Sequence, residues 1–219
     1  MGAYMPTQAS AAPRISCDRG IARRRSFLEA ALKAFCERGY AGVNVNDIVR
    51  EVGGSLATLY SQFGSKEGLF VAVLEECNAR FAGALCPVAD PALDLREGLQ
   101  RIGEHYLRRA MAPESRRFFR MICAASSEFP AEARECLRVG PNRVAEIAAD
   151  YLRARTAAER VTFDDCGAAA LAFFALVRGQ HQYRATFEDD YALSDDQIAE
   201  HVGQAVRILL HGAVRSVPV

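Results

Sequence analysis

The stretch from Asn44 to Lys66, NVNDIVREVGGSLATLYSQFGSK, constrains the fold more than any other part of the chain. The side chain of Asn44 can cap the start of a first short helix. The apolar residues of this helix recur at the three-and-four spacing of a buried stripe: Val45, Ile48, Val49, Val52. Gly53 and Gly54 end the helix, because glycine adopts the positive φ of a helix C-cap without steric cost. A helix followed by a tight turn is therefore predicted.

A second helix is predicted from Leu56 to about Phe63, with Ser55 as its cap. Leu59 and Phe63 are spaced to face inward. The other side chains turn to the remaining faces: Leu56, Ala57, Thr58, Tyr60, Ser61, Gln62. A solvated face ordinarily carries Glu, Lys and Arg, whereas these groups are small, apolar or hydrogen-bonding and can meet base edges and thymine methyl groups. The pattern indicates a helix-turn-helix whose second helix lies in the major groove.

Further residues at fixed spacing make the pattern more specific. They are Arg25, Phe27, Leu28, Ala31, Phe35, Gly39, Tyr40, Asp47, Ile48, Gly53, Ser55, Thr58, Leu59, Tyr60, Phe63, Ser65, Lys66, Glu67 and Leu69. With these residues, about the first third of the chain closely resembles the DNA-binding domain of the TetR family of transcriptional regulators. The resemblance implies a homodimer that binds a double-stranded DNA operator.

The residues expected to contact DNA follow from this reading. They are Arg25, Asn44, Asn46, Ser55, Leu56, Ala57, Thr58, Tyr60, Ser61, Gln62 and Lys66. Gln62 is chemically suited to adenine N6 and N7, and Tyr60 to a phosphate. Lys66 stands near a helix start, which the helix dipole disfavours for a cation, so a phosphate partner is expected. Arg23, Arg24 and Arg25 are either a solvated charge run or an arm that contacts phosphate or the minor groove; we favour the arm.

The charge distribution agrees with a nucleic-acid partner at the N-terminal end. The whole chain holds 27 Lys and Arg against 27 Asp and Glu. Residues 1–70 hold 9 basic and 6 acidic residues, which leaves 18 basic and 21 acidic residues for the remainder. The excess of positive charge therefore lies with the helix-turn-helix.

Helical periodicity continues through the chain, and no alternating strand pattern competes with it. We expect a disordered basic tail over residues 1–20, a helix-turn-helix domain over 21–70 and a helical effector-binding and dimerisation domain over 71–219. The fold class is all-α: a three-helix N-terminal domain followed by a helical bundle. The predicted helices outside the pair run over Ala22–Arg38, Lys66–Leu85, Ala92–Met111, Pro113–Ser126, Pro130–Arg138, Pro141–Arg155, Asp164–Phe187 and Ser194–Arg215.

The last two helices are candidates for a subunit interface. Residues 164–177 are apolar nearly all round, and the final helix carries a long apolar stripe. A four-helix interface with a second copy would cover both, and packing within one subunit is the alternative. The expected interface residues are Leu171, Phe174, Val202, Val206, Leu209 and Leu210.

Aromatic and flexible apolar residues in the C-terminal part are candidates for an effector pocket. The residues are His105, Tyr106, Phe118, Met121, Ile122, Phe173, Phe174, Val177 and His181. Ordinary core packing is the alternative for each. Residues 118–143 are also similar to the C-terminal domain of some TetR-type regulators, which implies a small-molecule effector of unstated identity.

The chain shows none of the common catalytic motifs, such as Gly-x-Ser-x-Gly, His-Glu-x-x-His or a Walker loop. We expect no enzyme activity, no cofactor and no metal. The 7 cysteines are scattered without Cys-x-x-Cys spacing and are interpreted as reduced thiols in a cytoplasmic protein without a membrane segment.

The predicted function is a DNA-binding transcriptional regulator, a repressor released from a palindromic operator by a small molecule. The alternative is a helical ligand-binding or interaction protein whose helix-turn-helix does not bind DNA.

Overall fold

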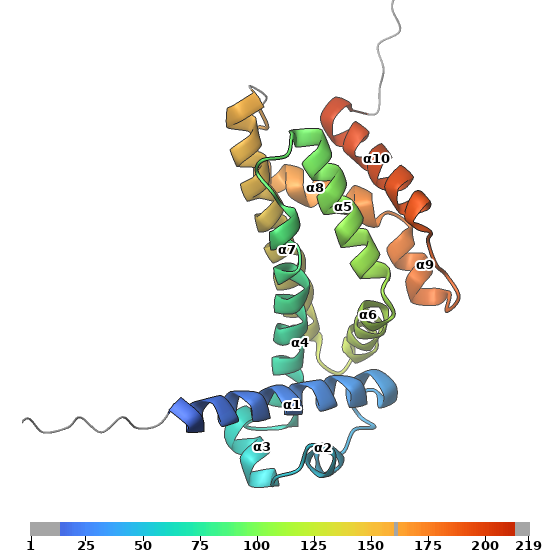
Figure 1. Cartoon of the computed structure of the whole chain (residues 1–219). Helices are drawn as coiled ribbons and strands as arrows, with labels where there is room; N and C mark the ends of the chain where they lie inside the picture. Colours follow the sequence, from blue (N-terminus) through green and yellow to red (C-terminus); the bar gives the residue numbers. More distant parts are fainter. Residues whose placement is uncertain (1–13, 160–161, 213–219) are drawn as a thin grey trace, which may run out of the picture.

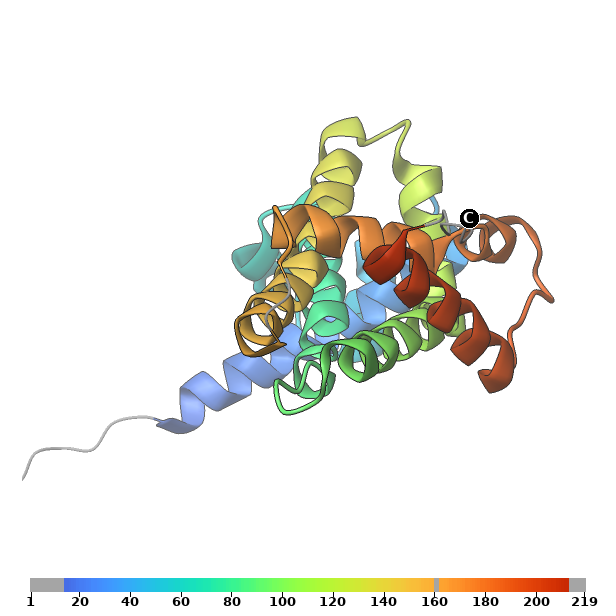
Figure 2. The same ribbon diagram turned by 90° about the horizontal axis from the view of Figure 1, so that it is seen from above.

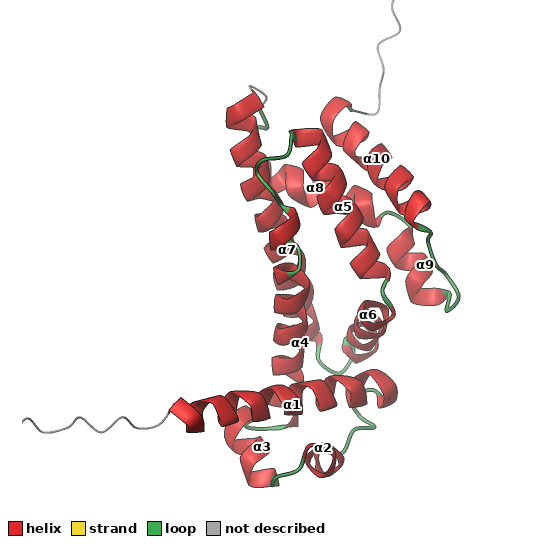
Figure 3. Ribbon diagram, viewed as in Figure 1, coloured by secondary structure: helices red, strands yellow, loops and turns green. Residues whose placement is uncertain are grey.

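The computed structural model describes residues 14–159 and 162–212. Within these ranges the chain forms helices and no strand, as Figure 3 shows, which confirms the predicted all-α class. The elements are α1 (Arg14–Arg38), α2 (Val45–Val52), α3 (Leu56–Phe63), α4 (Lys66–Gly83), the short 3-10 turn η1 (Cys86–Val88), α5 (Leu95–Met111), α6 (Pro113–Ala125), α7 (Pro130–Glu159), α8 (Cys166–Arg178), α9 (His181–Phe187) and α10 (Asp195–His211). None of the described helices is long and apolar enough to cross a bilayer.

The helix-turn-helix lies at one end of the molecule. Figure 1 shows α2 and α3 below α1 at the bottom of the view, with α4 rising from them beside α7. In the same view α5, α8 and α10 lie together at the upper end, and the view from above in Figure 2 shows them in front of the helices of the lower end. α4 therefore connects the two ends in a single continuous helix.

Two hydrophobic cores hold the helices together. The first core joins α1–α4 to α6 and to the start of α7, and includes Phe27, Phe35, Leu59, Phe70 and Met121. The second core joins the rest of α7 to α5, α8 and α10. Along α4, the first core ends at Leu74 and the second begins at Ala82, so the change of core falls inside this helix. Because α6 and α7 complete the first core, the helix-turn-helix is packed against the C-terminal part of the chain.

The ends of α2, α3 and α4 are fixed by the predicted caps. The side chain of Asn44 accepts from the backbone N–H of Asn46 at 2.9 Å. Ser55 Oγ accepts a hydrogen bond from the backbone N–H of Thr58 at 3.2 Å, and Ser65 Oγ accepts one from the backbone N–H of Gly68 at 3.0 Å. Each cap satisfies an N–H group that the helix itself leaves unpaired.

α1 begins earlier than predicted. The helix starts at Arg14 and not at Ala22, so the tail expected over residues 1–20 is wrong for residues 14–20. The first 13 residues of that expected tail lie outside the described part. After residue 13 this segment contains no proline and a single weak helix former, Gly20, so the helix can continue. The described residues from Gly20 to Ser26 are exposed, which explains why no apolar stripe marks this part of the helix.

α7 is one helix where two were predicted. Gly140 and Pro141 were interpreted as a break, but α7 runs through both from Pro130 to Glu159. A Cβ at Gly140 would lie 2.7 Å from Asn78 Oδ1, so the glycine allows α4 to approach α7 closely. Asn78 Nδ2 donates to the carbonyl of Cys136 at 3.2 Å. The contact with α4 therefore supports the segment of α7 next to the proline.

α8 and α9 are two helices where one was predicted over Asp164–Phe187. Gly179 ends α8 with a φ of 44°, a conformation that favours glycine. His201 Nε2 donates to the carbonyls of Leu176 and Val177 at 3.2 and 3.0 Å, so α10 satisfies acceptors that the break leaves free. α10 ends at His211, and residues 213–215 of the predicted last helix lie outside the described part.

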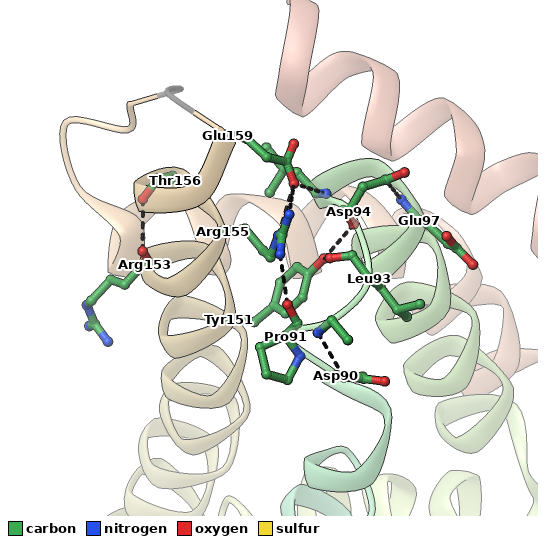
Figure 4. Close-up of polar contacts among 12 residues, drawn as sticks. Asp90, Pro91, Leu93, Asp94, Glu97, Tyr151, Arg153, Arg155, Thr156 and Glu159 are labelled. Carbon is green, nitrogen blue, oxygen red and sulfur yellow. Dashed lines mark hydrogen bonds and ion pairs between the residues drawn. The ribbon is translucent and has the colours of Figure 1, made fainter.

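A set of polar contacts holds the loop before α5 against the C-terminal half of α7 (Figure 4). The Tyr151 hydroxyl donates to the Asp94 carbonyl at 2.6 Å, and Arg155 Nη1 donates to the Pro91 carbonyl at 2.8 Å. Glu159 accepts both from Arg155 and from the backbone N–H of Leu95. These contacts satisfy backbone groups of the loop, which fixes the start of α5.

Candidate nucleic-acid interface

The outer face of α3 carries small and polar groups. Leu59 and Phe63 are buried in the first core, which confirms their predicted inward position. Ser55, Ala57, Tyr60 and Ser61 are exposed, with Tyr60 at 41%. Leu56 and Thr58 are half-buried. The helix contains no charged residue over its 8 positions, so nothing on it repels a phosphate or screens a base edge.

Gln62 does not lie on this outer face. Its side chain is half-buried, and its Oε1 is buried without a hydrogen-bond partner among the described residues. A contact with adenine through both the oxygen and the nitrogen needs this oxygen at the surface. The predicted base contact is therefore contradicted for this position of the side chain, and the exposed Ser61 is the better candidate for a base contact.

Asn44 and Asn46 are both exposed at the start of α2. Asn46 donates its backbone N–H and its side-chain amide to Asn44 Oδ1, at 2.9 and 3.0 Å. The cap thus occupies one oxygen of Asn44 and holds the two amides together. What remains for a phosphate is the NH₂ donor of Asn44.

The three consecutive arginines of α1 have separate roles. Arg23 donates to the carbonyl of Gly53 at 2.9 Å, at the end of α2. Arg24 donates to the carbonyl of Gln62 at 3.3 Å and lies 4.6 Å over the ring of Phe63, at the end of α3. A cation at a helix C-terminus is favoured by the helix dipole. Two arginines therefore tie α1 to the helix pair, and the predicted free arm is wrong for them.

Arg25 remains exposed and pairs with Glu29 at 3.0 Å, one turn along α1. The hydrogen bond with Arg25 holds the pKa of Glu29 below its ordinary value. The pair is open to solvent, where such contacts contribute little to stability. Arg25 can therefore exchange Glu29 for a phosphate, and its DNA contact stays a prediction.

Lys66 has a protein partner that the sequence did not reveal. Its Nζ lies 4.3 Å over the ring of Tyr40, a cation–π contact that offsets its position at the start of α4. Burial raises the pKa of Tyr40, and a hydrogen bond with Glu67 raises it further. The phosphate role of Lys66 also stays a prediction.

The predicted effector residues do not meet in one pocket. Phe118, Met121 and Ile122 pack in or against the first core. Tyr106, Phe173, Phe174 and Val177 are buried in the second core. Ordinary core packing, the alternative given above, therefore describes these residues.

Of the two predicted histidines, His105 lies on α5 and keeps a buried Nε2 without a partner in the described part. Only His181 lines a large cavity, of about 570 Å³, between α9 and α10. Its other lining residues are Gln180, Arg184, Glu188, Asp190, Tyr191, Ala192, Leu193, Gln197, Glu200, His201 and Gln204. Sequence reasoning missed these residues. The available signal was the recurrence of polar residues at helical spacing in two neighbouring segments, at 180, 184 and 188 and at 197, 200, 201 and 204.

The predicted interface residues divide into two groups. Phe174, Val202 and Val206 are fully buried in the second core of the same protomer, so the prediction is wrong for these three. Leu209 and Leu210 are half-buried, and Leu171 is 43% exposed. Leu171 belongs to an outer stripe of α8 with the exposed residues Ala168, Ala172 and Ala175. This stripe is apolar and made of small side chains apart from Leu171.

The six described cysteines form no disulfide with one another, and their reduced state stays a prediction. Burial raises the pKa of Cys36 and Cys136, and raises the pKa of Cys77 to about 12. A thiol with a raised pKa has little reactive thiolate at neutral pH. The geometry favours a packing role for these three side chains.

Comparison with known proteins decides the family. Residues 27–73 match the family "Bacterial regulatory proteins, tetR family", and residues 97–212, more than half of the chain, match "AefR-like transcriptional repressor, C-terminal domain". The chain belongs to the TetR family of transcriptional regulators. The likeness that the sequence motifs indicated is thereby confirmed.

Curated relatives in the TetR family match over shorter segments. The HTH-type transcriptional repressor ComR of Escherichia coli (strain K12) is 42% identical over 59 residues, 27% of this chain and 28% of ComR. The HTH-type transcriptional repressor NicS of Pseudomonas putida (strain KT2440) is 36% identical over 89 residues, 39% of this chain and 42% of NicS. Less than half of either relative is therefore matched.

Solved structures match over most of the chain. A protein of Mesorhizobium loti MAFF303099 assigned to the TetR family has a TM-score of 0.80 at 24% identity, over 88% of this chain and 96% of its own. The Flavonoid-responsive Regulator FrrA has a TM-score of 0.74 at 28% identity, over 86% of this chain and 95% of its own. The fold of the matched part of the chain is thus the TetR-family fold.

Proposed function

We propose that this protein is a sequence-specific DNA-binding transcriptional regulator, a repressor released from a palindromic operator by a small-molecule effector. The outer face of α3 carries the proposal. It is free of charge, exposes Ala57, Tyr60 and Ser61, and lies at the end of the molecule away from α8–α10 (Figure 1). The relatives ComR and NicS are both named transcriptional repressors, which supports repression as the output. Such a protein acts where the DNA lies, so we place it in the cytoplasm.

The proposed contacts follow from the helix-turn-helix geometry. α3 lies in the major groove, where Ala57 meets a thymine methyl group and Ser61 a base edge. Tyr60, Asn44 and Lys66 contact phosphates on either side, which sets register and contributes affinity without sequence preference. A two-fold dimer repeats these contacts in half-sites about one helical turn apart or a small multiple of it.

The proposed dimer forms through the outer stripe of α8. Ala168, Leu171, Ala172 and Ala175 are exposed in the protomer, and their small side chains allow a partner helix to approach closely. Leu209 and Leu210 of α10 are half-buried and extend the surface available to the partner. Phe174, Val202 and Val206 then support the interface from inside the protomer.

Leu171→Arg tests the dimer without disturbing a core. The side chain is 43% exposed in the protomer, so the variant is expected to fold, while a buried charge in the interface is expected to give monomers. Ile21→Arg is the control, because Ile21 is an exposed apolar residue of α1 with a side chain of the same size as that of leucine. Light scattering measures the mass of both. A Leu171→Arg variant that stays dimeric at all concentrations would show that the interface lies elsewhere.

Release of DNA requires coupling between the two ends of the molecule. The first core supplies a physical connection, because α6 and α7 complete the packing of α1–α4. Cys36 of α1 lies 4.0 Å from the sulfur of Met121 on α6, within this core. A coupling free energy of about 1–3 kcal/mol, the usual allosteric range, weakens operator binding by about five- to a hundredfold. A shift of α6 relative to α1 is the change that we propose.

Ala57→Glu tests the DNA contact of α3. The residue is exposed in the first turn of α3, where the helix dipole favours a carboxylate, so the fold is expected to persist. The new charge faces the DNA and is expected to abolish binding. A mobility shift with the DNA upstream of the protein's own gene and of its neighbours measures this. Ala131→Glu, exposed in the first turn of α7, is the matched control.

The wild type and the Ala131→Glu variant are expected to shift the same fragment, and the Ala57→Glu variant none. Equal shifts by all three proteins would remove α3 from the interface. A wild type that shifts no fragment would favour the helical ligand-binding or interaction protein.

A further inference from the structure

The large cavity between α9 and α10 has a polar wall. Its volume of about 570 Å³ falls in the range of small-molecule sites. Residues of α9, of the loop that follows it and of α10 supply most of the lining, and Figure 1 shows α9 at the right of the view, below the lower end of α10. Apart from Ala192 and Leu193, every lining residue has a polar side chain.

Two histidines and a tyrosine form the inner part of this wall. His181 is only 8% exposed, and its Nδ1 is hydrogen-bonded to the Tyr191 hydroxyl. The His181 ring lies edge-on to that of His201, with centroids 4.3 Å apart. In the described part of the chain, His181 Nε2 has no hydrogen-bond partner, although the residue lines the cavity. A polar atom that reaches the cavity without a protein partner is free to hydrogen-bond a ligand or solvent there.

His201 presents an acceptor to a ligand. His201 Nε2 is bonded to two carbonyl oxygens, which only accept, so this nitrogen carries the proton and Nδ1 of the neutral ring is an acceptor. Burial lowers the pKa of His181, and the neighbouring His201 and Arg184 lower it further. The neutral form of the His181 imidazole is therefore favoured.

The charged residues of the wall leave a negative excess. Arg184 is paired with Glu188 through two hydrogen bonds of 2.9 and 2.7 Å, and its guanidinium lies 4.1 Å over the Tyr191 ring. Asp190 and Glu200 have no ion-pair partner within residues 14–159 and 162–212. The single cation of the lining is thus neutralised, and two carboxylates remain.

We propose that this cavity binds a small organic cation of the amine or guanidine class. Its N–H donors would pair with Asp190 and Glu200 in charge-assisted hydrogen bonds, and with the free Nδ1 of His201. The proposal concerns a site distinct from the aromatic residues of the second core, which are packed against one another. The role of the cation as an effector rests on the proposed regulatory function. Its binding in the cavity does not depend on that function.

The wall of the cavity is connected to α6. Arg116 of α6 donates to the carbonyls of Ala185, Glu188, Asp189 and Tyr191, at 2.6–3.2 Å. Arg120 donates to the Ala185 carbonyl at 3.0 Å and pairs with Asp189. The same helix contributes Met121 and Ile122 to the first core beside α1. A movement of the loop that carries Asp190 therefore displaces α6, the helix that contacts the DNA-binding end.

Titration calorimetry of the full chain without DNA tests the site. Agmatine, a small molecule with an amine and a guanidine, is expected to bind once per protomer, and succinate, a dicarboxylate, is expected not to bind. Hydrogen bonds to charged groups are strong enough that Glu200→Gln and Asp190→Asn are each expected to weaken agmatine binding about tenfold. Glu146→Gln, exposed on α7, removes the same charge far from the cavity and is expected to change nothing.

Three results would overturn the proposal: no agmatine binding, agmatine binding that both variants leave unchanged, or binding of succinate. The effector role is tested separately by operator affinity with and without agmatine. If agmatine binds in the cavity and operator affinity stays constant, the site stands and the release mechanism of the proposed function fails. If agmatine releases DNA equally from the wild type and from an Asp190→Asn, Glu200→Gln double variant, the effector acts elsewhere and this site is overturned.

Discussion

Different physical factors determine the starts of α2 and α3 and the course of α7–α9. In the pair, a side chain at the cap position fixes each start: Asn44 for α2 and Ser55 for α3. In α7 and α8, contacts with other helices contribute beside the local caps. Asn78 of α4 packs against Gly140, and His201 of α10 satisfies the last carbonyls of α8. The first region is thus specified locally and the second by tertiary contacts.

This difference separates two tasks. A locally specified pair can keep its shape while it is moved as a unit, which suits an element that must fit a major groove. Helices whose ends depend on remote contacts change when those contacts change, which suits an element that must respond to a ligand. The three predictions below test this contrast, from the largest expected effect on stability to the smallest.

Gly140→Leu is expected to lower the free energy of unfolding by about 2–3 kcal/mol, because a side chain there meets Asn78 Oδ1 at 2.7 Å or less and separates α7 from α4. Gly83→Ala is the control, since a Cβ at this last residue of α4 meets nothing within 4 Å. Chemical denaturation of both variants measures the difference. A Gly140→Leu variant as stable as the control would mean that the α4–α7 contact does not determine the course of α7.

Ser55→Ala is expected to cost about 1 kcal/mol of unfolding free energy, the usual contribution of a cap, because the N–H of Thr58 loses its acceptor. Ser61→Ala is the matched control: its hydroxyl bonds the Thr58 carbonyl within the helix, and the change is expected to stay within about 0.5 kcal/mol. Denaturation followed by far-ultraviolet circular dichroism reports both. Equal effects of the two substitutions would argue against local specification of α3.

The stability of the α9–α10 region is expected to fall slightly between pH 7 and pH 5.5. Burial holds the pKa of His181 below its ordinary value of 6.5, so the unfolded chain takes up a proton there before the folded chain does. The unfolded state then binds more protons, and stability decreases as the pH falls through 6.5. The carboxyl groups with shifted pKa, such as Glu188, have an ordinary value of 4.5 and titrate below this window.

The urea midpoint at the two pH values measures this effect. His181→Asn is expected to reduce the pH dependence of the urea midpoint. If the His181→Asn variant keeps the full pH dependence, other groups are responsible for it. His105, whose pKa burial also lowers, is then the next candidate.

The contrast also explains what the sequence could predict. The bounds of α3 were predicted correctly, because Ser55 and Gly64 stand next to the residues whose backbone they serve. The sequence predicted two helices where α7 is one. The reason is that the space at Gly140 is filled by Asn78, which stands 62 positions earlier in the chain. The break at Gly179 was missed for the same reason, since the carbonyls of Leu176 and Val177 just before it are satisfied by His201 on α10.

The candidate site divides in the same way. Periodicity identified the inward and outward faces of α3, but it could not show that Gln62 Oε1 is buried or that Arg23 and Arg24 bond the helix ends. Apolar periodicity also does not distinguish a protomer core from a dimer interface. For this reason Phe174, Val202 and Val206 were assigned to the interface, although they lie in the second core. The polar cavity forms only once α9 and α10 are folded against each other.

The most direct test of the central claim, that the exposed face of α3 reads DNA, is a binding selection on randomised duplexes. The wild type is expected to select a palindrome. Ser61→Ala, which spares the fold, is expected to lose selectivity at one base pair in each half-site, by about 1–3 kcal/mol, with binding to random DNA nearly unchanged. Gln62→Ala, at a position whose side-chain oxygen is buried, is expected to select the wild-type sequence. Loss of selectivity in Gln62→Ala with none in Ser61→Ala would contradict the assignment of the face, and selection of no sequence by the wild type would contradict the claim itself.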